Sequence, residues 1–296
     1  MKASLIVAAS GRDTHLVNTL RCALAQRYSQ LEILVVDSVD NRSLIAEDFL
    51  TRKQARIRYM VLPKRSRLAL YNYAMAQATG DILIFINDHT SFGPYFVDQH
   101  MACYLENTMG AVQGRVVTSE TATSRLPNLT RTCQLKGHFN CNLAGSTNRL
   151  GEHNFSVRRS VADRVGAFDE QMDDCLEWAG ADYGLRCYKS GWNIRFESRA
   201  ELVVHGKQGV ASERLRRQHR LEGHHLVAQS LFAHRHLSPL MRGLHRFQQR
   251  WQGWSDVQQQ QKDAWKTVAA EADSITVHSS EDASVMMDVM TPHPHG

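Results

Sequence analysis

Short apolar runs recur along the first part of the chain, and polar residues or glycines bound each run. They cover residues 4–9, 31–37, 57–62, 82–86 and 111–117. A short apolar run with such boundaries is typical of a strand whose two faces are both covered, as in a parallel sheet. Each of these runs is therefore predicted to form a strand.

Between the predicted strands, apolar side chains recur with helical spacing. Leu16, Leu20 and Leu24 lie four residues apart, and residues 68–79 show a similar pattern. Pro94 stands where a further helix would begin, a position that favours proline. The alternation of strand and helix predicts an α/β fold, a sandwich with a mostly parallel central sheet.

The pattern weakens after about residue 120. Residues 118–152 are rich in Thr, Asn, Ser and Gly and are predicted to form a long ordered loop region. Shorter elements follow: helices at 160–166 and 182–190, and strands at 193–197 and 202–205.

This pattern predicts that the chain is divided into three segments. Residues 1–206 are expected to form the α/β domain, and residues 207–262 a basic helical extension. Residues 263–296 carry Ser, Asp and Glu with little periodicity, so a disordered tail is expected there.

Composition narrows the class of protein. The chain has 296 residues, 43% of them apolar, and a mean hydropathy of −0.39, which suits one large globular domain or one domain with an appendage. No apolar run is long enough to cross a bilayer. The N-terminal apolar segment resembles a short signal peptide, but polar residues follow it at once, so we interpret it as a strand. The six cysteines show no paired framework. Together these features predict a cytoplasmic protein.

The charge of the chain is mildly basic. A net charge of +5 is compatible with a phosphate-bearing ligand or an anionic surface. The basic residues do not form a long stripe with interleaved aromatics, so no nucleic-acid partner is expected. Residues 241–254 combine tryptophans on one helical side with arginines on a neighbouring side. Such a helix can lie on an anionic membrane, or its apolar side can pack on the α/β domain.

Polar side chains follow several predicted strands directly. Asp37 ends the second strand, and Asn87, Asp88 and His89 end the strand at 82–86. In open parallel sheets, ligands bind at the carboxyl ends of the strands. No dinucleotide or P-loop glycine motif is present. A functional site is therefore predicted at these strand ends, the alternative being an ordinary surface turn.

A second candidate metal site involves Cys133, His138 and Cys141, with His153 further along. Their spacing matches no common zinc template, so this alternative is not favoured.

The order of motifs resembles the family-2 inverting glycosyltransferases, which have the GT-A fold. The resemblance extends over roughly residues 3–206. The segments that carry it are 4–9, 24–28, 32–37, 72–81, 85–89, 114–117, 154–159, 165–170, 181–186 and 203–205.

This resemblance implies a nucleotide-sugar donor and a divalent metal, Mn²⁺ or Mg²⁺. His89 and His205 match the family's metal positions, although His89 stands where the family has an acid. The residues that would bind the nucleotide sugar are Ala8, Ala9, Gly11, Asp37, Arg67, Asn72, Asn87 and Asp88.

The resemblance also implies a catalytic base and an acceptor site. Asp182 matches the base that would take the proton of the acceptor hydroxyl. Asp182 can equally cap a helix, and Glu177 is an alternative base. Asn154 and Trp178 are expected to contact the acceptor, although Trp178 can equally have a packing role.

The function implied is transfer of a sugar, with inversion, to a hydroxyl on a glycan, a lipid-linked carrier or a small molecule. The family's acids are replaced by Asn87, His89 and Ala181. Two alternatives therefore stay open: a nucleotide-sugar-binding protein without turnover, and a metal-independent enzyme in which His89 contacts the diphosphate directly.

Overall fold

The computed structural model describes residues 1–9, 13–38, 57–63, 66–131, 133–205, 224–238 and 241–242. The chain divides into two units, Met1–Gln218 and His219–Gly296. The first unit contains a central sheet with helices. In the second unit, the described part is mainly the helix α8 (His224–His236).

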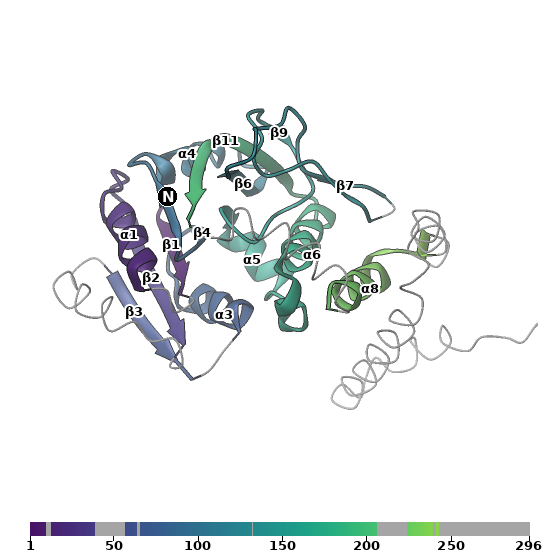
Figure 1. The fold of residues 1–296 in the computed structure, drawn as a ribbon, viewed down its shortest axis with the longest axis horizontal. Coiled ribbons are helices and arrows are strands. Elements are labelled where there is room, and N and C mark those ends of the chain that lie inside the picture. The colour runs from purple at the N-terminus through teal and green to yellow at the C-terminus, as the bar shows by residue number, and fades with distance from the viewer. Residues whose placement is uncertain are drawn as a thin grey trace, which may run out of the picture. The chain divides into compact units, whose positions relative to one another are not determined.

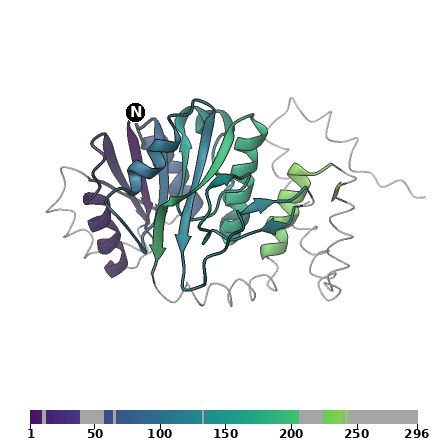
Figure 2. The same ribbon diagram turned by 90° about the horizontal axis from the view of Figure 1, so that it is seen from above.

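The sheet of the first unit has the strand order β3-β2-β1-β4-β10-β6-β11-β5, with β9 paired to β11 (Figures 1 and 2). The strands are β1 (Ala3–Ala8), β2 (Leu31–Ser38), β3 (Ile57–Leu62), β4 (Ile82–Asn87), β5 (Thr90–Phe92), β6 (Met109–Val117), β9 (Gly145–Ser146), β10 (Phe155–Arg158) and β11 (Asn193–Val204). The predicted α/β fold is confirmed.

The predicted parallel pairing holds through the N-terminal half of the sheet. Strand β1 pairs in parallel with β2 and β4, and β2 pairs in parallel with β3. Strands β6 and β11 are also parallel. By contrast, β10 lies antiparallel between β4 and β6, and β5 lies antiparallel to β11. Neither β5 nor β10 was predicted, because both are short and carry polar residues.

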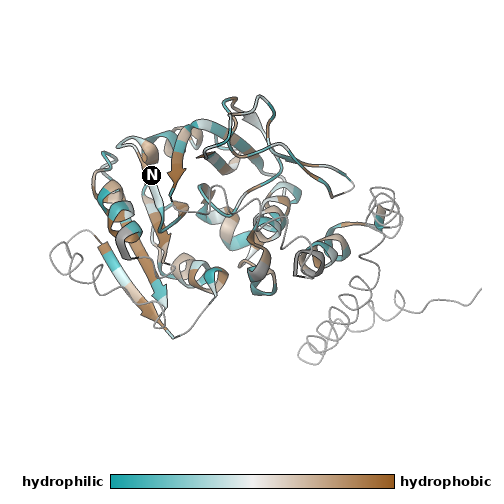
Figure 3. Ribbon diagram, in the orientation of Figure 1, coloured by the Kyte–Doolittle hydropathy of each residue, from teal (hydrophilic) through white to brown (hydrophobic). Residues whose placement is uncertain are grey.

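Helices cover both faces of the sheet, which accounts for the apolar side chains on both faces of its strands. Every residue of β1 and β4 is buried. On one face, Leu5 and Ile84 belong to the same cluster as Leu16 of α1 (Asp13–Leu24) and Phe96 of α4 (Phe96–Cys103). On the other face, the ring of Phe85 meets Tyr71 of α3 (Arg67–Gln77) edge to face. Figure 3 shows the resulting contrast between the apolar strands β1 and β2 and the mixed helices α1 and α3.

The helices in the second half of the unit differ partly from the prediction. Helix α5 (Arg159–Val165) ends at Gly166 as expected. A short 3-10 helix, η2 (Glu170–Cys175), leads into α6 (Leu176–Lys189). Because α6 begins at Leu176, Asp182 lies in its interior. The interpretation of Asp182 as a helix cap is therefore wrong.

The long loop region contains two further short strands, β7 (Asn128–Leu129) and β8 (Leu135–Lys136), which pair with each other. The two short strands expected near the end of the domain are one strand, β11, with a shift of register between Glu197 and Glu201. Within the described residues, no helix is long and apolar enough to cross a membrane.

Several predictions fall on residues that the structure does not describe. They include the role of Gly11, the tail at 263–296, and most of the segment 241–254, of which only Met241 and Arg242 are described.

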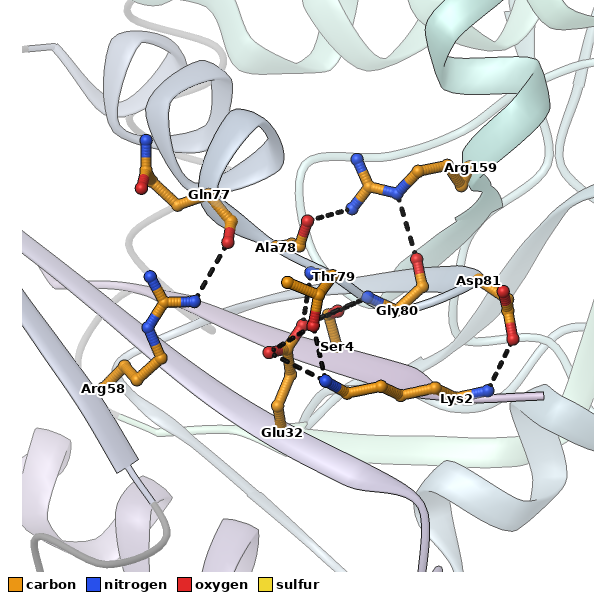
Figure 4. Close-up of polar contacts among 10 residues, drawn as sticks. All are labelled: Lys2, Ser4, Glu32, Arg58, Gln77, Ala78, Thr79, Gly80, Asp81 and Arg159. Atoms are coloured by element: carbon orange, nitrogen blue, oxygen red, sulfur yellow. Dashed lines mark hydrogen bonds and ion pairs between the residues drawn. The ribbon is translucent and has the colours of Figure 1, made fainter.

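A polar network holds the amino ends of β1, β2 and β4 together (Figure 4). The Glu32 carboxylate accepts hydrogen bonds from Ser4 Oγ at 2.5 Å, from the Thr79 backbone N–H at 2.6 Å and from the Gly80 N–H at 3.1 Å. Lys2 Nζ lies 3.4 Å from Glu32 Oε2. One carboxylate thus joins three chain segments that are distant in sequence.

Replacing Glu32 by Gln is expected to lower the free energy of unfolding by about 2 kcal/mol, because hydrogen bonds to a charged acceptor are lost. Burial raises the pKa of the Glu32 carboxyl, but the hydrogen bonds from Ser4 and Thr79 outweigh burial and lower that pKa overall. The contribution of the Glu32 carboxylate to the free energy of unfolding is therefore fully present above the pKa of the unfolded state. It is lost as the pH falls through the pKa of the folded state. Urea unfolding at neutral and acidic pH measures both effects.

The matched control is Glu201→Gln. Glu201 is 55% exposed and pairs with Arg115 at 3.4 Å, so its loss should change stability by less than about 0.5 kcal/mol. Equal effects of the two substitutions would contradict the role given to Glu32.

Candidate functional site

The register of the parallel strands brings three predicted site residues to one edge of the sheet. Ala8, at the end of β1, pairs with Val36 of β2 on one side and with Asn87 of β4 on the other. Asp37 follows Val36 directly. The carboxyl ends of three strands therefore meet, as the sequence predicted, and Ala9 N–H donates to Val36 O across this edge at 2.9 Å.

Asp37 is buried at the end of β2 and its carboxylate is held by neighbours. One oxygen accepts from the Ser38 backbone N–H at 2.7 Å, and the other accepts from the Tyr59 hydroxyl at 2.9 Å. These bonds fix the orientation of the carboxylate at the sheet edge.

Asn87 is fully buried, and both ends of its amide have partners. Its Oδ1 accepts a hydrogen bond from the Tyr71 hydroxyl at 2.7 Å. Burial raises the pKa of Tyr71, so this phenol stays protonated and donates. The amide nitrogen of Asn87 contacts Nδ1 of His153. The position of the Asn87 side chain is therefore fixed from two sides.

His89 is only 1% exposed, yet one of its ring nitrogens meets no hydrogen-bond partner in the described part of the chain. Its Nδ1 lies 3.0 Å from Oδ1 of Asp88. Since a carboxylate only accepts, Nδ1 carries the proton. Nε2 has no hydrogen-bond partner among the described residues. Burial lowers the pKa of His89, and the charges of His153 and Arg67 lower it further against the opposing effect of Asp88. The neutral ring thus presents a lone pair at Nε2.

His153 faces His89 at this site, whereas the sequence analysis considered it only with Cys133, His138 and Cys141 in the zinc alternative. The two rings meet edge to face with centroids 5.7 Å apart. Nε2 of His153 lies 3.1 Å from Oε1 of Glu152. The position of His153 just before β10 could not be identified as functional, because β10 itself was not predicted.

His205 lies beside His89, in keeping with the metal positions that the resemblance implied for both. Its backbone N–H donates to His89 O at 2.8 Å. Its Nε2 lies 2.6 Å from the Ser91 hydroxyl. The structure therefore brings the two predicted metal ligands to neighbouring positions, with the His205 ring held by Ser91.

Two further donor-site predictions lie on α3. The charge of Arg67 acts on His89 and Tyr71, which places this guanidinium near the site. Asn72 instead links α3 to the chain after α5: it donates to Phe168 O at 3.0 Å and accepts from Phe168 N–H at 2.8 Å. Contact between Asn72 and the nucleotide sugar stays a prediction, and it would require the hydrogen bonds between Asn72 and Phe168 to break.

The two candidate bases differ in their surroundings on α6. The Asp182 side chain is 1% exposed, and its Oδ2 lies 2.9 Å from Arg186 Nε. Arg186 also donates to Val165 O and Ala167 O. Glu177 lies in the first turn of α6, is 24% exposed and pairs with Arg149 at 2.5 Å. Asp182 therefore ties α6 to the end of α5, whereas Glu177 is the more accessible carboxylate.

The start of α6 lies close to the segment that carries His153. A Cβ atom at Gly180 would come within 2.8 Å of the Gly151 carbonyl group, so glycine permits the approach at this position. Arg149, the partner of Glu177, belongs to the same segment. Glu177 and His153 are thus brought to the same region by two independent contacts.

The predicted acceptor residues are buried. Asn154 has a left-handed backbone (φ 56°), and its amide donates to Arg115 O and Ala200 O. Its Oδ1 lies 2.9 Å from Nε2 of His100. Trp178 is 1% exposed inside α6. Acceptor contacts by Asn154 and Trp178 stay predictions, and both would require rearrangement of these side chains.

The chemistry of His89 fits a metal ligand. A histidine that binds a metal usually donates its other ring N–H to a carboxylate, which is the arrangement of Asp88 and His89. Among the described residues, no three His, Cys, Asp or Glu side chains are grouped to hold a metal. This result includes Cys133, His138 and Cys141, so the zinc alternative gains no support.

The comparisons with known proteins bear on this geometry. A family model described as Glycosyl transferase family 2 matches residues 4–166, more than half of the chain. The chain belongs to glycosyl transferase family 2. The matched range contains β1, Asp37, Asn87, His89 and His153. Helix α6 and His205 lie beyond the matched range.

Solved structures are similar to this family-2 chain in fold. S. aureus TarS 1-349 has 14% identity and a TM-score of 0.54, over 71% of this chain and 62% of that one. The mannosyltransferase PcManGT from Pyrobaculum calidifontis, in complex with GDP-Man and Mn²⁺, has 16% identity and a TM-score of 0.59, over 92% of this chain and 75% of that one. GalNAc-T7 with UDP, GalNAc and Mn²⁺ has 9% identity and a TM-score of 0.57, over 68% and 43%.

Identities this low show the fold, and the predicted GT-A-like fold is confirmed. This chain spans less than two thirds of TarS 1-349 and of the GalNAc-T7 chain. A search of curated proteins found no match in sequence.

The buried His100 contacts the segment that follows His153, and its protonation tests how that segment is packed. His100 Nδ1 lies 2.9 Å from Ser156 Oγ, and Nε2 contacts Asn154 next to His153. Burial lowers the pKa of His100 to about 4, below its ordinary value of 6.5. The unfolded chain therefore binds more protons between these values, so stability should fall as the pH drops from about 6.5 towards 4.

His100→Gln is expected to flatten this part of the pH profile, measured by urea unfolding. The control His138→Gln replaces an exposed histidine and should keep the wild-type slope. A wild-type slope in His100→Gln would show that other groups cause the pH dependence.

Proposed function

We propose that the chain transfers a sugar from a nucleotide-diphosphate donor to an acceptor hydroxyl, with inversion at the sugar carbon. The observation that carries this proposal is the buried His89, whose Nε2 has no partner among the described residues. It stands at the strand-end edge of a family-2 glycosyltransferase fold. A buried polar atom without a partner is costly unless a ligand satisfies it.

The donor would lie along the ends of β1, β2 and β4. Asp37 would accept from a base N–H, and Ala8 and Ala9 would allow the ligand to approach the backbone closely. Arg67 would neutralise phosphate charge. Asn87 would order this edge through its amide, and Asp88 would act through the ring of His89 that it orients.

His89 and His205 would hold a divalent metal, Mn²⁺ or Mg²⁺, beside the diphosphate. When bound, the metal supplies Lewis-acid stabilisation of the leaving group. Mn²⁺ is named in the PcManGT and GalNAc-T7 structures, which supports this cofactor class. His205 would have to exchange its contact with Ser91 for the metal.

The acceptor hydroxyl must lose its proton to a carboxylate within reach. We assign this role to Glu177, because it is accessible and lies near the segment of His153. The resemblance favoured Asp182, which stays the alternative. The Asp182 side chain is only 1% exposed and is held by Arg186, so it is less accessible to an acceptor than Glu177.

The acceptor class is a glycan, a lipid-linked carrier or a small molecule. A cytoplasmic protein with peripheral membrane contact through 241–254 would suit a lipid-linked acceptor. The second candidate function is nucleotide-sugar binding without turnover. It is favoured by Asn87 and His89 standing where the family has acids.

Donor binding can be tested by thermal shift with UDP, GDP, dTDP and CDP, each with Mn²⁺, Mg²⁺ or EDTA. One nucleotide is expected to stabilise the protein with a metal, by roughly 2.7 kcal/mol at a hundredfold excess over its dissociation constant. Stabilisation that survives EDTA would select the metal-independent alternative. No shift with any nucleotide would remove the donor assignment.

Two isosteric substitutions distinguish the bases. Glu177→Gln is expected to lower kcat by about a hundredfold or more, as for loss of a general base. Asp182→Asn is expected to lower the free energy of unfolding by about 2 kcal/mol, because Arg186 loses a charged partner. Transfer assays with the identified nucleotide sugar, together with urea unfolding, measure both.

The opposite pattern, with kcat lost in Asp182→Asn and kept in Glu177→Gln, would return the base to Asp182. Donor binding by the wild-type protein without any transfer would favour the second candidate function.

A further inference from the structure

His153 has the surroundings of a metal ligand, although nothing in the resemblance assigns it a role. Its Nε2 faces the Glu152 carboxylate at 3.1 Å, so this nitrogen carries the proton. Nδ1 then presents its lone pair, which accepts from the Asn87 amide. His89 repeats the arrangement: a carboxylate on one nitrogen and a lone pair on the other.

The distance between the two rings suits a shared ion. Metal–nitrogen bonds of about 2.1 Å place an ion about 3.2 Å from a ring centroid, so two rings on one ion lie at most about 6.4 Å apart. The observed centroid separation is 5.7 Å. A cation would take the place of the Asn87 N–H at Nδ1 of His153.

We propose that His89 and His153, oriented by Asp88 and Glu152, form a two-imidazole site for a transition-metal ion. The part of the chain that the structure describes offers no third grouped His, Cys, Asp or Glu ligand. His205 would join this ion only by leaving the Ser91 hydroxyl, so the remaining coordination positions are open to His205, water or phosphate oxygens. The inference deepens the proposed donor site and rests on it for its purpose, but metal binding by the chain alone tests it.

This ligand set determines which metals bind best. Imidazole nitrogen suits later transition metals, whereas Mg²⁺ prefers oxygen ligands. Affinity should therefore rise from Mg²⁺ through Mn²⁺ to Co²⁺ and Zn²⁺. Carboxylates in the same positions would give Mg²⁺ and Mn²⁺ a relative advantage.

Calorimetric titration of the full chain with Co²⁺, with and without nucleoside diphosphate, tests the site. His89→Asn and His153→Asn are each expected to weaken Co²⁺ binding at least tenfold. Glu152→Gln should weaken it about tenfold by releasing the ring of His153. His138→Asn, an exposed histidine in the long loop region, is the matched control and should bind as the wild type does.

Unfolding midpoints of each variant establish that the fold is retained, and Glu152→Gln keeps the test valid if His153→Asn does not fold. Wild-type Co²⁺ affinity in both His153→Asn and Glu152→Gln would overturn the proposal. So would Mg²⁺ binding more tightly than Co²⁺, or no Co²⁺ binding under either condition.

The two proposals can fail separately. Nucleoside diphosphate binding in EDTA without any Co²⁺ binding would keep the donor site and remove this metal site. Co²⁺ binding through both histidines without any nucleoside diphosphate binding would keep the metal site and remove the proposed function.

Discussion

The parallel pairing of β1 with β2 and β4 is the constraint on which the site depends. Parallel strands in register end at the same edge, so Ala8, Asp37 and Asn87 are neighbours although the chain separates them widely. The two faces of these strands pack against different partners, Leu5 and Ile84 in the cluster of α1 and α4 and Phe85 against Tyr71, so a slip by one residue would mispack both faces. At the opposite ends of the same strands, the Glu32 network holds Ser4 and Thr79 together.

Because the strand ends are buried, their polar groups need partners. A series of side-chain contacts, from Tyr71 to Asn87, from Asn87 to His153 and from His153 to Glu152, satisfies most of these polar groups. The Nε2 of His89 is the exception in this cluster. An internal network of this kind holds its members rigidly, since each group has one set of partners. The structure thus combines a fixed support with one open nitrogen, as a binding site requires.

Helix α6 shows how the same residue types separate into different roles. Asp182 and Glu177 are both acids on one helix, and each has an arginine partner. Asp182 is buried, and its arginine is bonded to the chain after α5. Glu177 is in the first turn and remains accessible. Position along the helix therefore decides which carboxylate is accessible from outside.

The sequence by itself determined the α/β fold, the N-terminal strands and the edge where Asp37, Asn87 and His89 meet, because apolar runs and strand ends are local patterns. It did not identify β5 or β10, which are too short for periodicity to detect, nor the start of α6 at Leu176. Only the tertiary structure decided that His153 faces His89, that Asn72 and Asn154 serve internal contacts, and that Trp178 is buried. These facts depend on contacts between distant segments, which local sequence patterns do not encode.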